Sequence, residues 1–195
     1  MSAASWDERY ARRDWLRAPS STVVDAVGDL PAGRAVDLAA GPGRHARWLA
    51  DRGWQVTAVD VSAVGIEQGR AADPAGAVEW VVADAGHWAP AGPVDLVLAA
   101  YVQLGVDGLQ RAAGWLATGG RLVVVGHALR NLAVGVHGPK DPAHLQTEQV
   151  LRAGADGLVV ERLEEVLRPD EGGTVVELLL VARCDRRPGL DVLPG

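Results

Sequence analysis

The sequence predicts an α/β fold, in which a seven-stranded, mostly parallel, doubly wound sheet has helices on both faces and an antiparallel hairpin at its C-terminal end. Three observations predict this class. From residue 35 onward, short apolar runs alternate with segments of helical periodicity, as parallel strands with crossover helices do. A glycine turn follows the first apolar run. Two long apolar segments near the C-terminus flank a Pro-Asp-Glu-Gly-Gly turn at residues 169–173, which is typical of a hairpin.

Two helices are predicted before the first strand, over residues 6–16 and 22–30. The Pro-Ser-Ser sequence at 19–21 separates them and provides a cap for the second helix. Trp6 and Tyr10 are four residues apart and therefore share one face of the first helix. From the residues alone, this aromatic face either packs on the edge of the sheet or closes over a ligand.

The first strand and the turn after it are the most informative segment. Residues 35–40 are apolar except for Asp37 and predict a buried parallel strand. Gly41 and Gly43, on either side of a proline, then permit a tight turn and a close approach of a ligand to the backbone. The segment therefore predicts a binding site at the carboxyl end of the first strand.

A helix over residues 44–52 follows the turn and ends at Gly53, and its first amides are expected to face the ligand. The second strand, residues 56–59, is followed by Asp60. A carboxylate in this position is placed to accept hydrogen bonds from the two vicinal hydroxyls of a ribose. We therefore expect a cofactor that contains a nucleoside.

The remaining elements alternate along the chain. Leu109, Ala113 and Leu116 recur at helical spacing and predict a helix over residues 107–117. Residues 128–147 are the least regular internal stretch, and long loops inside compact domains are usually functional. The further strands are predicted over residues 78–82, 94–100, 119–125, 158–167 and 174–182.

Two cofactor classes fit this geometry. The spacing of Gly41, Gly43 and Ala46, with an acid about 20 residues further on, matches the dinucleotide pattern, so a nicotinamide cofactor is one alternative. Two further acids favour another class. Asp37 lies inside the first strand, and Asp84 follows the third.

Together these acids and the turn resemble the class I S-adenosylmethionine-dependent methyltransferases, whose fold is Rossmann-like. Among them, the chain looks most like the small tellurite-resistance and thiopurine methyltransferase-type enzymes. The resemblance implies that Asp37 steadies the turn and the methionine end of S-adenosylmethionine, that Asp60 takes the ribose, and that Asp84 lies near the adenine amine. Ala39 departs from the family, which commonly has glycine there, and is expected to tighten the methionine pocket.

The resemblance also implies an in-line methyl transfer to a small-molecule acceptor with a sulfur, selenium, oxygen or nitrogen nucleophile. Some acceptors need a base, and the candidate catalytic residues are His127 and Tyr101. Residues 1–30 are then expected to form a helical lid, and residues 128–147 an insert on the acceptor side. The predicted cofactor-binding residues are Asp37, Ala39, Gly41, Gly43, Asp60, Val61, Asp84, Ala85 and Ala100, and the predicted acceptor-side residues are Trp6, Tyr10, Gln103, Arg130 and His137, with Arg130 as the cation for an anionic acceptor.

Composition indicates one methyltransferase domain over residues 1–195, because 195 residues that are 48% hydrophobic can bury a complete core. A net charge of −6 without a basic cluster disfavours nucleic acid as a partner. No stretch approaches the roughly 18 apolar residues of a membrane span. One cysteine and no signal sequence indicate a cytoplasmic protein. We expect a loose tail over residues 185–195 and no metal site.

Two other functions stay open as alternatives. A short-chain nicotinamide oxidoreductase needs a tyrosine followed four residues later by lysine, but Tyr10 and Tyr101 are followed at that spacing by Asp14 and Gly105. A module that binds S-adenosylmethionine without turnover differs from an enzyme in its acceptor cavity, which a sequence does not display. The sequence predicts neither the identity of the acceptor nor the oligomeric state.

Overall fold

The structure, a computed structural model, describes residues 2–12, 15 and 17–185. Beyond Asp185, the predicted tail lies outside the described residues. The strands are β1 (Arg34–Leu38), β2 (Gln55–Asp60), β3 (Val78–Val82), β4 (Val94–Ala100), β5 (Leu116–His127), β6 (Val159–Asp170) and β7 (Gly173–Arg183). The helices are α1 (Ala3–Arg12), α2 (Ser21–Val27), α3 (Arg44–Ala50), α4 (Ala63–Ala71), α5 (Gly105–Ala113), α6 (Asn131–Val134) and α7 (Glu148–Gly154), with the 3-10 turn η1 (Pro142–His144).

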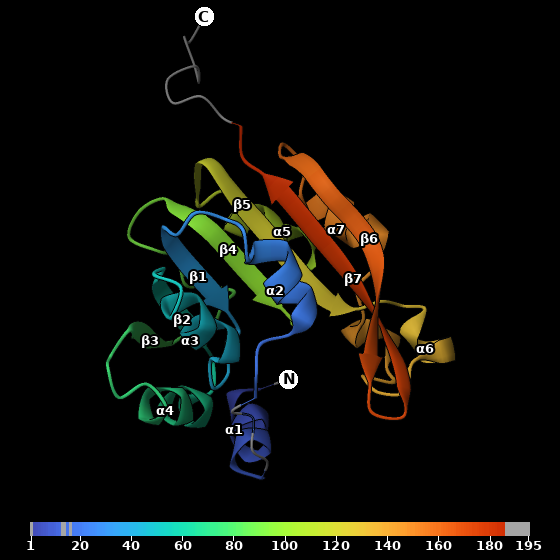
Figure 1. Cartoon of the computed structure of the whole chain (residues 1–195), viewed down its shortest axis with the longest axis horizontal. Coiled ribbons are helices and arrows are strands. Elements are labelled where there is room, and N and C mark those ends of the chain that lie inside the picture. Colours follow the sequence, from blue (N-terminus) through green and yellow to red (C-terminus); the bar gives the residue numbers. More distant parts are fainter. Residues whose placement is uncertain (1, 13–14, 16, 186–195) are drawn as a thin grey trace, which may run out of the picture.

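The strands form one sheet in the order β3-β2-β1-β4-β5-β7-β6 (Figure 1). β1 pairs in parallel with both β2 and β4, whereas β7 is antiparallel to β5 and β6. The predicted doubly wound, Rossmann-like sheet with a C-terminal hairpin is therefore confirmed. The direction of winding reverses between β1 and β4, and in such folds ligands bind beyond the carboxyl ends of the strands at this point.

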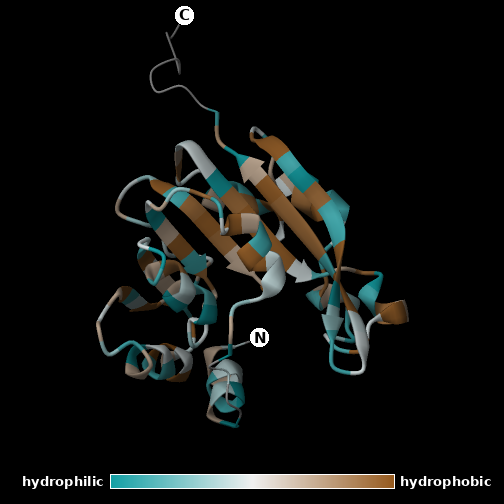
Figure 2. Ribbon diagram, in the orientation of Figure 1, coloured by the Kyte–Doolittle hydropathy of each residue, from teal (hydrophilic) through white to brown (hydrophobic). Residues whose placement is uncertain are grey.

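Helices cover both faces of the sheet, as predicted. α2 and α3 bury Val23 and Leu49 in the core on one face. α5 and α7 bury Leu109 and Leu151 in the core on the other face. In Figure 2 the central strands are hydrophobic along most of their length, whereas β6 at the edge alternates between polar and apolar residues. The well-packed centre of the sheet, β1 and β4, thus forms a rigid base for the site.

The helix predicted over residues 107–117 is wrong at its C-terminal end. α5 ends at Ala113, and Leu116 begins β5 by pairing with Val94 of β4. The apolar spacing that suggested a longer helix arises because Leu116 is also buried, but as a strand residue. Gly114 separates the two elements, and glycine disfavours continuation of a helix.

The N-terminal prediction also needs correction. The first helix, predicted over residues 6–16, spans Ala3–Arg12, and most of the predicted remainder lies outside the described residues. α2 is part of the core rather than of a lid, because Val23 and Val27 are buried against the sheet. Only α1 of the predicted lid lies at the carboxyl edge of the strands, next to α4 (Figure 1).

The backbone at Ala39 predicts a stabilising substitution. Ala39 has a φ of 56°, a left-handed conformation that costs an L-residue about 1–2 kcal/mol and glycine almost nothing. After the greater entropy of the unfolded chain is subtracted, Ala39→Gly should raise the free energy of unfolding by roughly 0.5–1 kcal/mol. Urea unfolding measures this difference. Ala40→Gly is the control, because Ala40 has no positive φ and should lose stability; a loss at both positions would contradict the prediction.

Candidate functional site

Asp60 orders the glycine turn at the carboxyl edge of the sheet. Its carboxylate accepts hydrogen bonds from the backbone N–H of Gly41 at Oδ2 and of Ser62 at Oδ1, both at 2.8 Å. Gly41 and Gly43 have φ values of 56° and 71°, and Asp60 is 4% exposed. Burial raises the pKa of Asp60, and the two amides oppose that rise. β1 and β2 therefore place a buried carboxylate against a turn without side chains.

Asp37 has a buried oxygen that no described group satisfies. The residue lies within β1 and is 1% exposed, and its Oδ2 has no hydrogen-bond partner among the described residues. Burial raises the pKa of Asp37 to about 7, while Arg44 and the backbone amide of Ala46 oppose the rise. An unsatisfied buried polar atom is costly and often marks a ligand position.

Tyr10 lies over the glycine turn. A β-carbon at Gly41 would lie 2.5 Å from the Tyr10 hydroxyl, and one at Gly65 would lie 3.0 Å from the ring. Burial raises the pKa of Tyr10, and Asp60 and Asp37 add to the rise because their charges repel a phenolate. The aromatic face of the first helix therefore points to the carboxyl edge of the sheet rather than to the sheet core.

Asp7 attaches α1 to the first turn of α4. Its Oδ1 accepts hydrogen bonds from the Ser62 hydroxyl at 2.5 Å and from the Val64 N–H at 3.1 Å. These bonds lower the pKa of Asp7. Trp6 stacks on the outer side of Tyr10, with the ring centroids 5.6 Å apart. The hydrogen bonds of Asp7 to Ser62 and Val64 hold α1 beside the site.

Tyr101 borders the site after β4. It has a φ of 61°, which is strained for a non-glycine residue. Its hydroxyl lies 2.7 Å from Glu177 Oε1 and 2.8 Å from Ser20 Oγ, and burial raises the pKa of Tyr101 to about 12. Glu177 is wholly buried in β7 and also accepts hydrogen bonds from Thr22 Oγ1 at 2.5 Å and Arg168 Nε at 2.8 Å. The phenol is therefore fixed by bonds to two distant parts of the chain, and Thr22 and Arg168 hold Glu177 in turn.

His127, at the end of β5, faces the same ring. The centroids of His127 and Tyr101 are 5.5 Å apart, and Nδ1 of His127 is buried without a partner among the described residues. Burial lowers the pKa of His127, so its imidazole is neutral at pH 7 and one ring nitrogen can accept a hydrogen bond or a proton. Gly138 of the insert packs against the ring. The structure thus brings the two predicted catalytic residues together.

Asp84 follows β3 at the same edge but is exposed. Its Oδ1 accepts the N–H of Gly86 at 2.7 Å, and its Oδ2 lies 3.2 Å from Nδ1 of His87. The Gly86 bond, followed by that to His87, lowers the pKa of Asp84, so the carboxylate is charged at neutral pH. The remaining predicted cofactor-binding residues at this edge are Val61, Ala85 and Ala100.

Three predicted acceptor-side residues already have protein partners. Arg130 forms an ion pair with Glu165 at 3.1 Å and is exposed. His137 is exposed, and its Nε2 lies 3.0 Å from a backbone carbonyl in the β6–β7 turn. Gln103 donates to a backbone carbonyl of the insert at 2.7 Å. The charge of Arg130 is therefore already compensated in this structure.

The comparison with protein families decides the class of this domain. Residues 35–120, which include the glycine turn, Asp37, Asp60 and Asp84, match the sequence profile of a family described as methyltransferase domain. Residues 35–120 therefore belong to a methyltransferase domain of the class I S-adenosylmethionine-dependent superfamily. This confirms the membership that the acids and the turn predicted.

The curated relatives that this chain matches are named trans-aconitate 2-methyltransferase. The trans-aconitate 2-methyltransferase of Streptomyces coelicolor is 34% identical over 187 residues, which cover 87% of this chain and 57% of that protein. The enzyme of the same name from Azoarcus sp. is 46% identical over 101 residues, which cover 49% of this chain and 38% of that protein. The chain spans about half the length of the curated relatives it matches.

Solved structures with low sequence identity to this chain share its fold. TehB from Haemophilus influenzae has a TM-score of 0.70 at 16% identity, covering 92% of this chain and 67% of that chain. The N-methyltransferase NodS from Bradyrhizobium japonicum, in complex with S-adenosyl-L-homocysteine, has a TM-score of 0.71 at 15% identity, covering 93% and 99%. At such identities the likeness concerns the fold alone.

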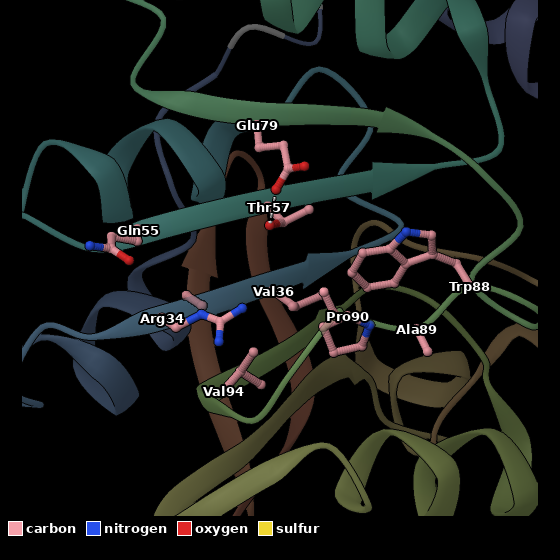
Figure 3. Close-up of a pocket in the computed structure, with 11 residues that line it drawn as sticks. Arg34, Val36, Gln55, Thr57, Glu79, Trp88, Ala89, Pro90 and Val94 are labelled. Carbon is pink, nitrogen blue, oxygen red and sulfur yellow. Dashed lines mark hydrogen bonds between the residues drawn. The ribbon is translucent and has the colours of Figure 1, made fainter.

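A pocket also lies near the amino-terminal ends of the strands, away from the glycine turn (Figure 3). Arg34, Thr57 and Glu79 line it from the amino-terminal halves of β1, β2 and β3, and Trp88 borders it from the loop of residues 83–93. Thr57 Oγ1 donates to Glu79 Oε2 at 2.7 Å. The pocket exists because that loop contains no helix to cover this part of the sheet. It lies at the opposite ends of the strands and is not part of the site.

The sequence did not predict the buried residues that lie behind Tyr101. Thr22, Arg168 and Glu177 meet there from three distant segments. A signal did exist for Glu177, because an acid inside the apolar run of residues 175–182 must find a partner. Arg44 directly follows the glycine turn, and its role is also visible only in the fold.

The described residues contain neither a metal-binding cluster nor a membrane-spanning helix. Within residues 2–12, 15 and 17–185, no three His, Cys, Asp or Glu side chains are grouped so that they would hold a metal ion. In the same part of the chain, no helix has the length and apolar character needed to cross a membrane.

Proposed function

We propose that this chain is an S-adenosylmethionine-dependent methyltransferase that transfers a methyl group to a small-molecule acceptor. One observation carries the proposal: at the glycine turn, Asp60 binds the turn while buried Asp37 keeps an oxygen free. A ligand with a ribose at one end and a cationic amino acid at the other requires two such carboxylates. The names of the curated relatives, trans-aconitate 2-methyltransferase, support a small-molecule acceptor.

The residues present fit this cofactor, which supplies an electrophilic methyl group on a sulfonium when bound. Each oxygen of Asp60 accepts one backbone amide and retains a further lone pair for a ribose hydroxyl. The free Oδ2 of Asp37 suits the ammonium group of the methionine end. Glycine at positions 41 and 43 lets Tyr10 and Trp80 pack against the turn, because a β-carbon at either position would overlap one of these rings. We assign the adenine side to Asp84, with Val61, Ala85 and Ala100 beside it.

The residues after β4 and β5 are suited to the acceptor. Methyl transfer is an in-line displacement, so the main task is to align the acceptor about 3–3.5 Å from the methyl carbon. Tyr101 provides a fixed wall, and the free nitrogen of His127 can take a proton from a hydroxyl or an amine. A thiolate or selenide arrives ionised and needs alignment only. Gly138 of the insert of residues 128–147 packs against His127, and Tyr10, stacked with Trp6, lies over the glycine turn. These two distant segments are proposed to border the acceptor.

Titration calorimetry of the full chain with S-adenosylmethionine, S-adenosyl-L-homocysteine and NAD(H) tests the cofactor assignment. We expect binding of the first two at about micromolar Kd and none of NAD(H), because the first two carry an amino-acid ammonium group for the free oxygen of Asp37, whereas NAD(H) has a second nucleotide in that place. Binding of NAD(H) alone would contradict the proposal. Release of S-adenosyl-L-homocysteine with a panel of acceptors then separates an enzyme from a binding module.

A further inference from the structure

One cation at the site, Arg44, lies over the ring of Tyr101. Arg44, the first residue of α3, is half-buried, and its Cζ lies 4.9 Å from the centroid of the Tyr101 ring. Among the described residues, none forms a hydrogen bond or ion pair with this guanidinium. Two other arginines in this part of the molecule differ, since Arg168 and Arg130 each have a carboxylate within 3.1 Å. Within the described part of the chain, no carboxylate occupies the N–H edge of Arg44, which can therefore bind an anion.

The neighbours of the Tyr101 ring add no opposing charge. His45 stacks at 6.4 Å, and burial lowers its pKa to about 3 while its Nε2 accepts the Ser20 N–H at 3.3 Å. His127 is neutral at pH 7 for the same reason. The nearby acid Glu177 is already bound by Arg168. The acid that interacts with Arg44 is Asp37, which belongs to the β1 side of the site.

We propose that Arg44 binds a carboxylate of the methyl acceptor beside the Tyr101 ring. This inference rests on the proposed function and names the class of its substrate. A guanidinium that stacks on an aromatic ring keeps its N–H edge free for a bidentate bond to a carboxylate. Tyr101 follows β4 and His127 ends β5, whereas Asp37 and Asp60, the two carboxylates proposed for the cofactor, belong to β1 and β2. A carboxylate on Arg44 therefore lies on the acceptor side.

The Arg44–Tyr101 pair is also preformed. The Tyr101 hydroxyl is fixed by Glu177 and Ser20, and its backbone N–H donates to the Val125 carbonyl at 2.7 Å. A cation held over a fixed ring loses little conformational freedom when an anion binds, so less binding free energy is spent on ordering. The pair thus replaces Arg130 as the candidate for recognition of an anionic acceptor.

The test is titration calorimetry of the full chain, saturated with S-adenosyl-L-homocysteine, using trans-aconitate and its neutral trimethyl ester as probes. We expect the acid to bind and the ester not to bind. Arg44→Gln should weaken binding of the acid roughly 10- to 100-fold, the range for a lost charge-assisted bidentate contact. Arg44→Lys should lie between, because it keeps the charge but not the fork. Affinity for S-adenosyl-L-homocysteine should stay within about twofold in both variants.

Arg52→Gln is the matched control, because Arg52 also lies 4.9 Å over an aromatic ring, that of Trp48, but outside the site. It removes the same charge and should leave both affinities unchanged. Equal binding of acid and ester, binding of neither, or unchanged binding in Arg44→Gln would overturn the proposal. So would a tenfold or greater loss of S-adenosyl-L-homocysteine affinity in Arg44→Gln, of about 1.4 kcal/mol, because Arg44 would then belong to the cofactor. Failure of the wild-type chain to bind S-adenosyl-L-homocysteine would refute the proposed function instead.

Discussion

Asp60→Ala is expected to lower the free energy of unfolding by about 2–4 kcal/mol and to abolish measurable cofactor binding. The change removes the acceptor of the Gly41 and Ser62 amides, and each buried donor left without a partner costs about 1–3 kcal/mol. It also removes the carboxylate proposed for the ribose. Urea unfolding without ligand measures the first effect, and titration with S-adenosyl-L-homocysteine measures the second.

Glu79→Ala is the control for Asp60→Ala. Glu79 is an exposed acid on the adjacent strand β3, and it accepts one hydrogen bond from a threonine side chain at the other edge of the sheet. We expect its loss to change stability by less than about 1 kcal/mol and to leave binding unchanged. Wild-type stability in Asp60→Ala would show that the amides do not depend on this carboxylate.

Asp37→Asn is expected to make the ligand-free protein more stable than wild type at pH 8 and to weaken cofactor binding. Burial raises the pKa of Asp37 from 3.8 to about 7. A carboxyl group with a raised folded-state pKa contributes its stability below the unfolded pKa, and this contribution is lost as the pH rises through the folded pKa. The loss therefore falls between about pH 4 and pH 7. Asparagine stays neutral, so the gain at pH 8 should be on the order of 1–3 kcal/mol.

His45 makes the pH profile of Asp37→Asn distinctive. Burial lowers the pKa of His45 from 6.5 to about 3, so its contribution is present above pH 6.5 and is lost as the pH falls. In the wild type the two slopes oppose each other between about pH 4 and pH 6.5. In the variant the opposing slope of Asp37 is removed while that of His45 remains, so stability should fall more steeply than in the wild type between about pH 6.5 and pH 4. Urea unfolding at a series of pH values measures this.

Asp107→Asn is the control for the pH profile, because Asp107 is exposed in the first turn of α5. Its curve should run parallel to that of the wild type. If Asp37→Asn also runs parallel to the wild type between pH 4 and pH 8, Asp37 is not the buried acid that sets the profile.

The cofactor half of the site could be predicted from the sequence because one contiguous segment forms it. An apolar strand, a glycine turn and the next strand place Asp37, Gly41 and Asp60 together whatever the rest of the chain does. The same kind of local signal predicted the alternation of strands and helices along the chain. The double role of Asp60, which binds the turn as well as being placed for a ribose, became visible only with the backbone geometry.

The acceptor half could not be predicted, because its contacts join distant residues. Thr22 and Glu177 are separated by 155 positions, and Tyr101 and Glu177 by 76. No local pattern encodes which buried donor meets which acid. The sequence also suggested Arg130 as a free cation, but the strand pairing brings Glu165 beside it. Arg44, which lies over the Tyr101 ring without an ion pair to any described residue, is the residue that only the fold identifies.

The walls of the site differ in mechanical stiffness. On one side Tyr101 donates hydrogen bonds to buried Glu177 and to Ser20, so displacing it would break both of these bonds. On the other side α1 is attached to α4 by the partly exposed carboxylate of Asp7, and water can replace such bonds at little cost. Since Tyr10 lies over the glycine turn, the wall that covers this turn is the one whose bonds water can reach.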